Sequence, residues 1–125
     1  MSHSKGQLEA RISEALIKFE REYMGRGPEE AKSYLIGDLV VVRLRGVLTP
    51  AERQLAQSNP SDQGRNLIKQ VRSELLERGR PLLESLMAEI TGQKVRSLHT
   101  DISTVTGERI IVFSLSGPVF PQETP

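Results

Sequence analysis

The spacing of apolar residues changes from a helical period to a strand period twice along the chain, each time just after a glycine. Before Gly25 the apolar side chains recur every three or four residues, which places them on one side of a helix over residues 7–24. They are Leu8, Ile12, Ala15, Leu16, Phe19 and Tyr23. Gly25 is a natural end for this helix, because glycine enters the left-handed conformation freely. Gly92 ends a second helical stretch in the same way.

The stretch after Gly25, "AKSYLIGDLVVVRLRGVL", predicts a β-hairpin. Gly37-Asp38 separates two β-rich runs and is typical of a two-residue turn. Because side chains alternate along a strand, the second run presents two different faces. One face carries Val40, Val42 and Leu44, and the other carries Leu39, Val41, Arg43 and Arg45.

Two helical segments follow this hairpin. In "LTPAERQLAQ", Thr49 is placed as an N-cap, Pro50 takes the first helical position, and Glu52 completes a capping box. After the turn-rich "SNPSDQG", an apolar stripe extends over residues 63–91, and Gly79 and Pro81 interrupt it. Proline removes an intrahelical hydrogen bond and crowds the preceding turn. We therefore expect either one long helix kinked near Gly79 or two helices in series.

The stretch "KVRSLHTDISTVTGERIIVFSLSG" predicts a second hairpin, with its turn at residues 104–107. On its first strand, one face carries Leu98, Thr100 and Ile102, and the other carries Val95, Ser97, His99 and Asp101. On its second strand, Ile111, Phe113 and Leu115 alternate with Ile110, Val112 and Ser114. Both strands therefore have one face suited to a core.

The order helix, hairpin, two helices, hairpin predicts an α+β fold. The simplest packing joins both hairpins in a four-stranded antiparallel sheet with the helices on one face. We predict a single domain over residues 7–117, with a flexible tail at 1–6 and a C-terminal tail at 118–125. Residues 7–48 and 80–117 are similar enough in pattern to suggest an α-β-β duplication, although the same pattern is common in unrelated chains.

The second face of this predicted sheet is half apolar. It carries Val41, Ile110 and Val112 among polar residues. An uncovered face of this kind often marks self-association. The sequence therefore predicts a homodimer.

The composition excludes several classes of function. With no cysteine among its 125 residues, the chain has no disulfide, no thiolate nucleophile and no cysteine zinc site. A net charge of +1 and an aromatic content of 4% give little support to nucleic-acid binding. No signal peptide is recognisable, and no apolar run approaches the roughly 20 residues of a membrane helix. We expect a cytoplasmic protein that is not inserted in a membrane and has no cofactor or metal.

His99 and Asp101 are the first candidate site residues, because they lie two apart on one strand face. A carboxylate beside an imidazole raises the pKa of the imidazole, as in general acid–base pairs. The sequence places no recognisable nucleophile or second motif histidine with them. The plainer interpretation, which we favour, is a polar strand face with a local hydrogen bond.

Three arginines are further candidates. Arg43 and Arg45 are expected on the same face as His99 and Asp101, where they could receive a carboxylate, phosphate or bicarbonate-like anion, because guanidinium groups suit flat oxyanions. The alternative is a cross-strand ion pair with Asp101, or simple solvation, which contributes little. Arg26, in "GRGP", follows a helix instead of opening one, so it lacks a phosphate-loop context and remains only a spare anion contact.

Four runs of the chain together carry a family resemblance: "FEREYMGRGP", "VVRLRGVLTPAERQL", "LIKQVRSELLERGRPLLE" and "SLHTDISTVTGERIIVF". In this order and spacing they resemble the MpsC-like family of small bacterial proteins. The resemblance covers nearly the whole chain, from about Gly6 to Leu115. It singles out several motif positions without assigning them roles: Arg26, Gly27, Pro28, Arg43, Gly46, Thr49, Pro50, Glu52, His99, Thr100, Asp101 and Gly107.

The resemblance implies a link to a cation-translocating, membrane-potential-generating system, connected with inorganic-carbon supply in some bacteria. It brings no catalytic residues that can be carried over. We therefore expect a non-enzymatic accessory or regulatory protein that binds a protein partner of a cation-translocating or inorganic-carbon uptake system. The alternative is a small-anion or nucleotide sensor that uses Arg43, Arg45, His99 and Asp101.

Overall fold

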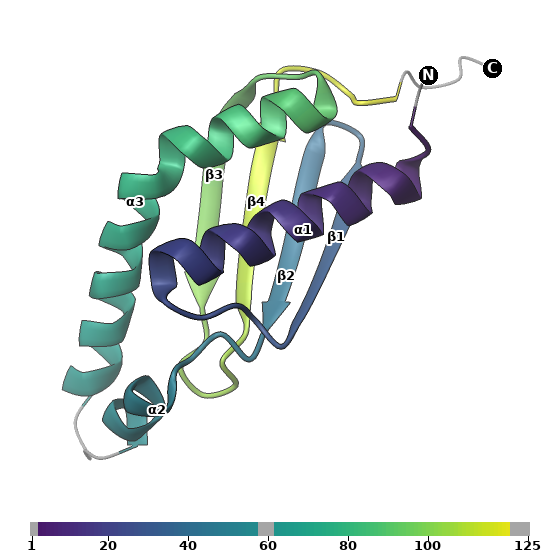
Figure 1. Ribbon diagram of the computed structural model, residues 1–125. Coiled ribbons are helices and arrows are strands. Elements are labelled where there is room, and N and C mark those ends of the chain that lie inside the picture. The colour runs from purple at the N-terminus through teal and green to yellow at the C-terminus, as the bar shows by residue number, and fades with distance from the viewer. Residues whose placement is uncertain (1–2, 58–61, 121–125) are drawn as a thin grey trace.

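The computed structural model describes residues 3–57 and 62–120 (Figure 1). Their elements confirm the predicted order and the α+β class. They are α1 (Lys5–Met24), β1 (Glu30–Ile36), β2 (Leu39–Arg45), α2 (Pro50–Gln57), α3 (Gln63–Thr91), β3 (Val95–Ile102) and β4 (Arg109–Leu115). Most of the predicted "SNPSDQG" turn and parts of both predicted tails lie outside the described residues.

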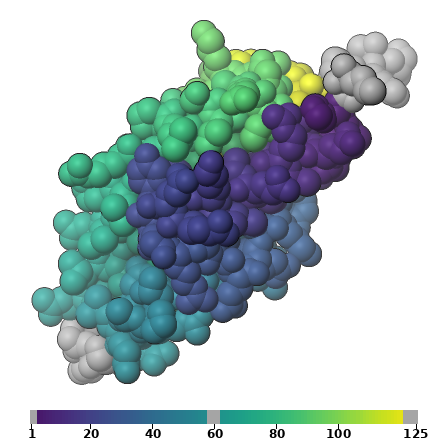
Figure 2. Space-filling view, in the orientation of Figure 1, coloured from purple at the N-terminus to yellow at the C-terminus, as the bar shows by residue number. Residues whose placement is uncertain are grey.

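The four strands form one antiparallel sheet in the order β1-β2-β4-β3. Figure 1 shows α1 and α3 over the same face of this sheet, and Figure 2 shows their side chains meeting along that side of the molecule. The core lies between these layers. Val42 and Ile111 pair across the two central strands, and both are fully buried. Their neighbours Val41 and Val112 face the other way, so the predicted alternation on β2 and β4 is confirmed.

Helix caps account for where α1 and α2 begin. Ser4 Oγ accepts a hydrogen bond from Gln7 N at 3.2 Å, and Ser4 N donates to Gln7 Oε1 at 2.8 Å. This capping box starts α1 at Lys5, two residues before the predicted start, inside the segment predicted as a tail. The predicted capping box of α2 is confirmed by hydrogen bonds of 2.9 and 3.2 Å between Thr49 and Glu52.

α3 is one continuous helix that contains Pro81, which decides between the two predicted arrangements. Figure 1 shows it changing direction midway. Gly79 lies in this part of the helix and packs against α1. A Cβ atom on Gly79 would come within 2.3 Å of Phe19 Cε2, so glycine permits the close approach of the two helices.

Val95 was predicted on the face of Ser97, and this is wrong. The register of β3 shifts between Val95 and Ser97, so that Val95 pairs with Leu115 and packs against the core, while Ser97 pairs with Ser114. A bulge adds a residue and turns the following side chains to the opposite face. At the end of the chain, Val119 packs partly buried against the core, within the segment predicted as a C-terminal tail.

Candidate functional site

The sheet face opposite the helices carries four of the five candidate residues, namely Arg43, Arg45, His99 and Asp101. Arg43 pairs with Ile110, and Ile110 pairs with Asp101. The next row joins Val41, Val112 and His99. The register thus places Arg43, His99 and Asp101 on one face, as expected. We call the following residues the open sheet face: Glu30, Lys32, Tyr34, Val41, Arg43, Arg45, His99, Asp101, Glu108, Ile110 and Val112.

Arg43 and Arg45 both reach Glu108, the residue just before β4. Arg43 Nε donates a hydrogen bond to Glu108 Oε2 at 2.7 Å, and Arg45 Nε lies 3.8 Å from the same oxygen. Arg45 Nη1 also lies 3.7 Å from Glu30 Oε2. The two arginine side chains remain 42% and 50% exposed. Glu108 therefore takes the place of the predicted Asp101 as the carboxylate partner on this face.

His99 and Asp101 have different partners. His99 Nε2 lies 3.2 Å from Ser97 Oγ. Asp101 Oδ1 accepts hydrogen bonds from Ile102 N at 2.8 Å and from Lys69 Nζ on α3 at 3.3 Å. The backbone hydrogen bond from Ile102, together with Lys69, lowers the pKa of Asp101. Among the described residues, the two side chains make no hydrogen bond to each other.

Arg26 lies apart from these residues, in the loop between α1 and β1. It donates to the backbone oxygen of Leu48 and to Glu29 Oε1, both at 3.3 Å. The five predicted site residues therefore do not converge. Arg43 and Arg45 meet at Glu108, whereas Arg26, His99 and Asp101 each bind elsewhere.

A second group of charges lies on the covered side of the sheet, and the sequence analysis missed it. We call Glu20, Glu52, Arg72 and Arg109 the buried charge cluster. Each lies in a different element: Glu20 in α1, Glu52 in α2, Arg72 in α3 and Arg109 in β4. Glu20 is fully buried, and the two arginines are each only 2% exposed.

The guanidinium of Arg72 donates hydrogen bonds to Glu52 and to the backbone of Val47. Its Nε and Nη2 donate to the two carboxylate oxygens of Glu52 at 2.7 and 2.6 Å, and Nη2 also donates to Val47 O at 2.8 Å. This two-point pairing fixes the plane of the guanidinium. Burial alone would raise the pKa of Glu52, but hydrogen bonds from Arg72 and Thr49 hold it below its ordinary value.

Glu20 lies between the two arginines without a close partner. Its oxygens are 3.5 Å from Arg72 Nη1 and 4.0 Å from Arg109 Nη1. Neither Glu20 oxygen nor either of these nitrogens makes a hydrogen bond with the described residues. Burial raises the pKa of Glu20 against the opposing charges of Arg109 and Arg72. Burial also lowers the pKa of Arg109, against the attraction of Glu20.

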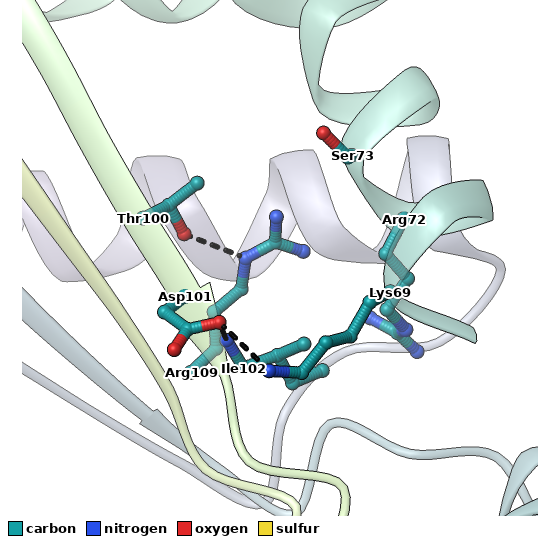
Figure 3. Close-up of a pocket in the computed structure, with 7 residues that line it drawn as sticks. All are labelled: Lys69, Arg72, Ser73, Thr100, Asp101, Ile102 and Arg109. Atoms are coloured by element: carbon teal, nitrogen blue, oxygen red, sulfur yellow. Dashed lines mark hydrogen bonds and ion pairs between the residues drawn. The ribbon is translucent and has the colours of Figure 1, made fainter. Parts of the chain in front are cut away.

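A pocket of about 200 Å³ opens beside this cluster, between α3 and the β3–β4 hairpin. Figure 3 shows the guanidinium of Arg109 reaching into the space between β3 and α3, where its Nε donates to Thr100 Oγ1 at 3.1 Å. Lys69 extends from α3 toward Asp101. The lining residues are Lys69, Arg72, Ser73, Thr100, Asp101, Ile102 and Arg109.

The sequence does carry a signal for the buried charge cluster. Glu20 stands four residues after Leu16, on the apolar stripe of α1. Arg72 stands midway between Ile68 and Leu76 on the stripe of α3. Arg109 alternates in phase with the buried residues of β4. A charge in phase with an apolar stripe is buried together with it, and a buried charge needs a partner.

Two comparisons with known proteins found matches that cover most of the chain. The model of the family described as "Na+-translocating membrane potential-generating system (MpsC)" matches residues 4–117. The chain is similar to "Uncharacterized protein YbcI" of Bacillus subtilis (strain 168), with 44% identity over 115 residues, which is 92% of this chain and 90% of that protein. No solved structure matches.

Two further findings concern membranes and metals. None of the helices within residues 3–57 and 62–120 has both the length and the apolar character to span a membrane. Within the same residues, no three side chains of His, Asp or Glu come together as they would to ligate a metal ion.

Proposed function

We propose a function from one premise: the chain belongs to the MpsC family, whose description names a Na⁺-translocating, membrane-potential-generating system. On this premise the protein is a non-enzymatic accessory or regulatory component of such a system. It acts in the cytoplasm as a homodimer and binds a protein partner at the membrane. The open sheet face is the observation that carries this proposal.

The surroundings of His99 support a non-enzymatic role. The contact between His99 and Ser97 lies on an exposed part of β3. A serine–histidine pair needs a third group that orients the ring and a site that stabilises the developing oxyanion. Asp101, the nearest carboxylate along the strand, bonds to Ile102 and Lys69 instead.

The open sheet face is suited to a second copy of this chain. Its central strands present Val41, Ile110 and Val112, which no described helix covers. Charged residues of both signs lie around them. Three are positive and three are negative: Lys32, Arg43 and Arg45, and Glu30, Asp101 and Glu108. A two-fold interface brings the same patch against itself. A face with matched charges meets that requirement, whereas a face of one sign would repel its copy.

Light scattering tests the dimer. We expect the mass of a dimer for the wild-type chain and of a monomer for Val112→Asp, because the added carboxylate would be buried without a partner. Val105→Asp is the matched control, since Val105 is 84% exposed in the β3–β4 turn. A monomeric wild-type chain, or a Val112→Asp variant that remains dimeric and folded, would contradict the proposed interface.

The membrane potential of cells tests the accessory role. Cells without the chain should show a lower sodium-dependent potential, measured with a voltage-sensitive dye. The wild-type chain and Val105→Asp should restore it, and Val112→Asp should not. An unchanged potential in cells without the chain would overturn the link to ion translocation, whatever the oligomeric state.

A further inference from the structure

We propose that the pocket between α3 and the β3–β4 hairpin binds a tetrahedral oxyanion of the phosphate class. This site borders the open sheet face, with which it shares Asp101, and the proposal does not depend on the proposed function. Its core is Arg109 and Arg72, which are both 2% exposed and both line the pocket. The Nη1 atoms of both arginines are buried beside Glu20, at 3.5 and 4.0 Å from its oxygens, and make no hydrogen bond within the described residues, so they contribute positive charge behind the pocket wall.

The wall of the pocket is rich in donors and positive in charge. Lys69, Arg72 and Arg109 supply three cationic groups, and Ser73 and Thr100 supply two hydroxyls. Among the described residues, Asp101 is the only carboxylate that lines it. Guanidinium and ammonium groups with spare N–H donors bind oxyanions through charge-assisted hydrogen bonds, which are about twice as strong as neutral ones.

Neighbouring side chains hold the two arginines in position. Glu52 fixes the plane of Arg72 through two hydrogen bonds, and Thr100 holds Nε of Arg109. Glu20 contacts both arginines at 3.5 and 4.0 Å but does not line the pocket. The arginines are thus oriented before a ligand arrives, which reduces the entropy lost on binding.

The size and lining of the pocket favour a small ion over a nucleotide. About 200 Å³ is below the range of roughly 300–1,000 Å³ typical of pockets for drug-sized ligands. The lining residues within 3–57 and 62–120 include no aromatic side chain on which a base could stack.

The directions of the donors favour a tetrahedral ion over a planar carboxylate. Lys69, Arg72 and Ser73 approach from α3, and Thr100 and Arg109 approach from the hairpin. A tetrahedral ion offers oxygens to both walls at once. A single carboxylate offers only two oxygens in one plane.

Lys69 and Asp101 form the part of the site that an anion would rearrange. Their ion pair spans 3.3 Å, and the side chains are 47% and 81% exposed. An anion in the pocket competes with Asp101 for the Lys69 ammonium. Removing the Asp101 charge should therefore strengthen anion binding, and removing Lys69 should weaken it.

Isothermal titration with inorganic phosphate tests the proposal on the full chain, at constant ionic strength so that general screening does not change. We expect saturable binding that is about tenfold weaker in Lys69→Gln, a factor that corresponds to about 1.4 kcal/mol. Asp101→Asn should bind more tightly. Lys18→Gln, which removes an exposed lysine from α1, is the matched control and should bind as the wild type does.

Amide chemical shifts locate the bound ion. Phosphate should shift the backbone amide signals of Ser73 and Thr100, and acetate at the same concentration should shift them less. The proposal is overturned if the wild-type chain shows no saturable phosphate binding at millimolar concentrations. It is also overturned if Lys69→Gln and Lys18→Gln lose affinity equally, if acetate binds as tightly as phosphate, or if the shifts occur away from the pocket.

Discussion

The two sides of the sheet carry the same chemistry in opposite surroundings. On the open sheet face, Arg43 and Arg45 meet Glu108 with side chains that are about half exposed. On the covered side, Arg72 meets Glu52 and Glu20 while only 2% exposed. Water screens the first network and is excluded from most of the second.

This difference changes what the ion pairs do for the fold. An exposed pair contributes about 0–1 kcal/mol, because solvent already stabilises both charges. A buried pair has lost that solvation, so removing one member strands the other. The buried charge cluster also joins α1, α2, α3 and β4. Its strict geometry therefore favours one arrangement of these four elements, even where its net contribution to stability is small.

The largest predicted effect comes from Arg72→Ala. It would leave Glu20 and Glu52 without their shared partner, at a cost of about 3–5 kcal/mol in the free energy of unfolding. Urea denaturation would measure this loss. Arg78→Ala, an exposed position on the same helix, is the control and should cost less than about 1 kcal/mol. Similar losses of stability for Arg72→Ala and Arg78→Ala would contradict the difference between buried and exposed charges.

A variant that fails to fold would still be informative. Combining Arg72→Met with Glu52→Gln removes the charge of Glu52 along with its partner and leaves Glu20 beside Arg109. Replacing a buried ion pair by uncharged side chains of similar volume is often neutral or stabilising. The double variant should therefore be more stable than Arg72→Ala alone, and a double variant that is no more stable would argue against stranded charge as the cause.

Adjacent isoleucines on β4 give the second largest effect. Ile111 is fully buried under the helices, whereas Ile110 lies partly exposed on the open sheet face. Ile111→Ala should lower the free energy of unfolding by about 2–5 kcal/mol, and Ile110→Ala should lower it by less than half as much. Urea denaturation of the monomer measures both losses. Equal costs at concentrations where the chain is dimeric would instead indicate that a second copy covers Ile110.

The elements of the fold were predictable because each leaves a local mark on the sequence. Alternation placed Val42 and Ile111 in the core, and the Thr49–Glu52 pair marked the start of α2. The position of Val95 was not predictable in this way, since a bulge reverses a face without changing the residue pattern. The continuity of α3 through Pro81 depends on tertiary packing, which a local rule does not include.

The candidate sites were less predictable than the fold. The register of the sheet could place Arg43 and Asp101 on one face, but it could not show that Glu108 would be the partner of Arg43. Glu20 and Arg109 occupy positions where the apolar period predicts a buried side chain, so the sequence does indicate that these charges are buried. These charges form a cluster only when four separate elements pack together, so no single stripe reveals which charges meet.

The pH dependence of stability gives a third, smaller effect. Glu20 has a raised pKa in the folded chain, so its stabilising contribution is full below the ordinary value of 4.5 and is lost as pH rises through its folded pKa. Glu52 has a lowered pKa, so its contribution is present above 4.5 and is lost as pH falls through its folded pKa. The slope for one group is at most about 1.4 kcal/mol per pH unit.

Glu20→Gln and Glu52→Gln separate these opposite trends. Relative to Glu20→Gln, the wild-type chain should lose stability as pH rises above 4.5. Relative to Glu52→Gln, it should lose stability as pH falls below 4.5. Urea denaturation at a series of pH values measures both differences. If the two differences changed with pH in the same direction, the two carboxylates would not occupy the contrasting surroundings described above.

The smallest predicted effect belongs to Arg43 and Glu108 on the open sheet face. A double-mutant cycle with Arg43→Ala and Glu108→Ala should give a coupling of about 0.2–1 kcal/mol in the monomer, reduced in 1 M salt. Repeating the cycle above the dimerisation concentration sharpens the comparison, because a second copy would exclude water from the pair. We expect the coupling then to increase and to become less sensitive to salt, so the pair would behave more like the buried charge cluster. An unchanged coupling would mean that the dimer, if it forms, leaves this part of the face in water.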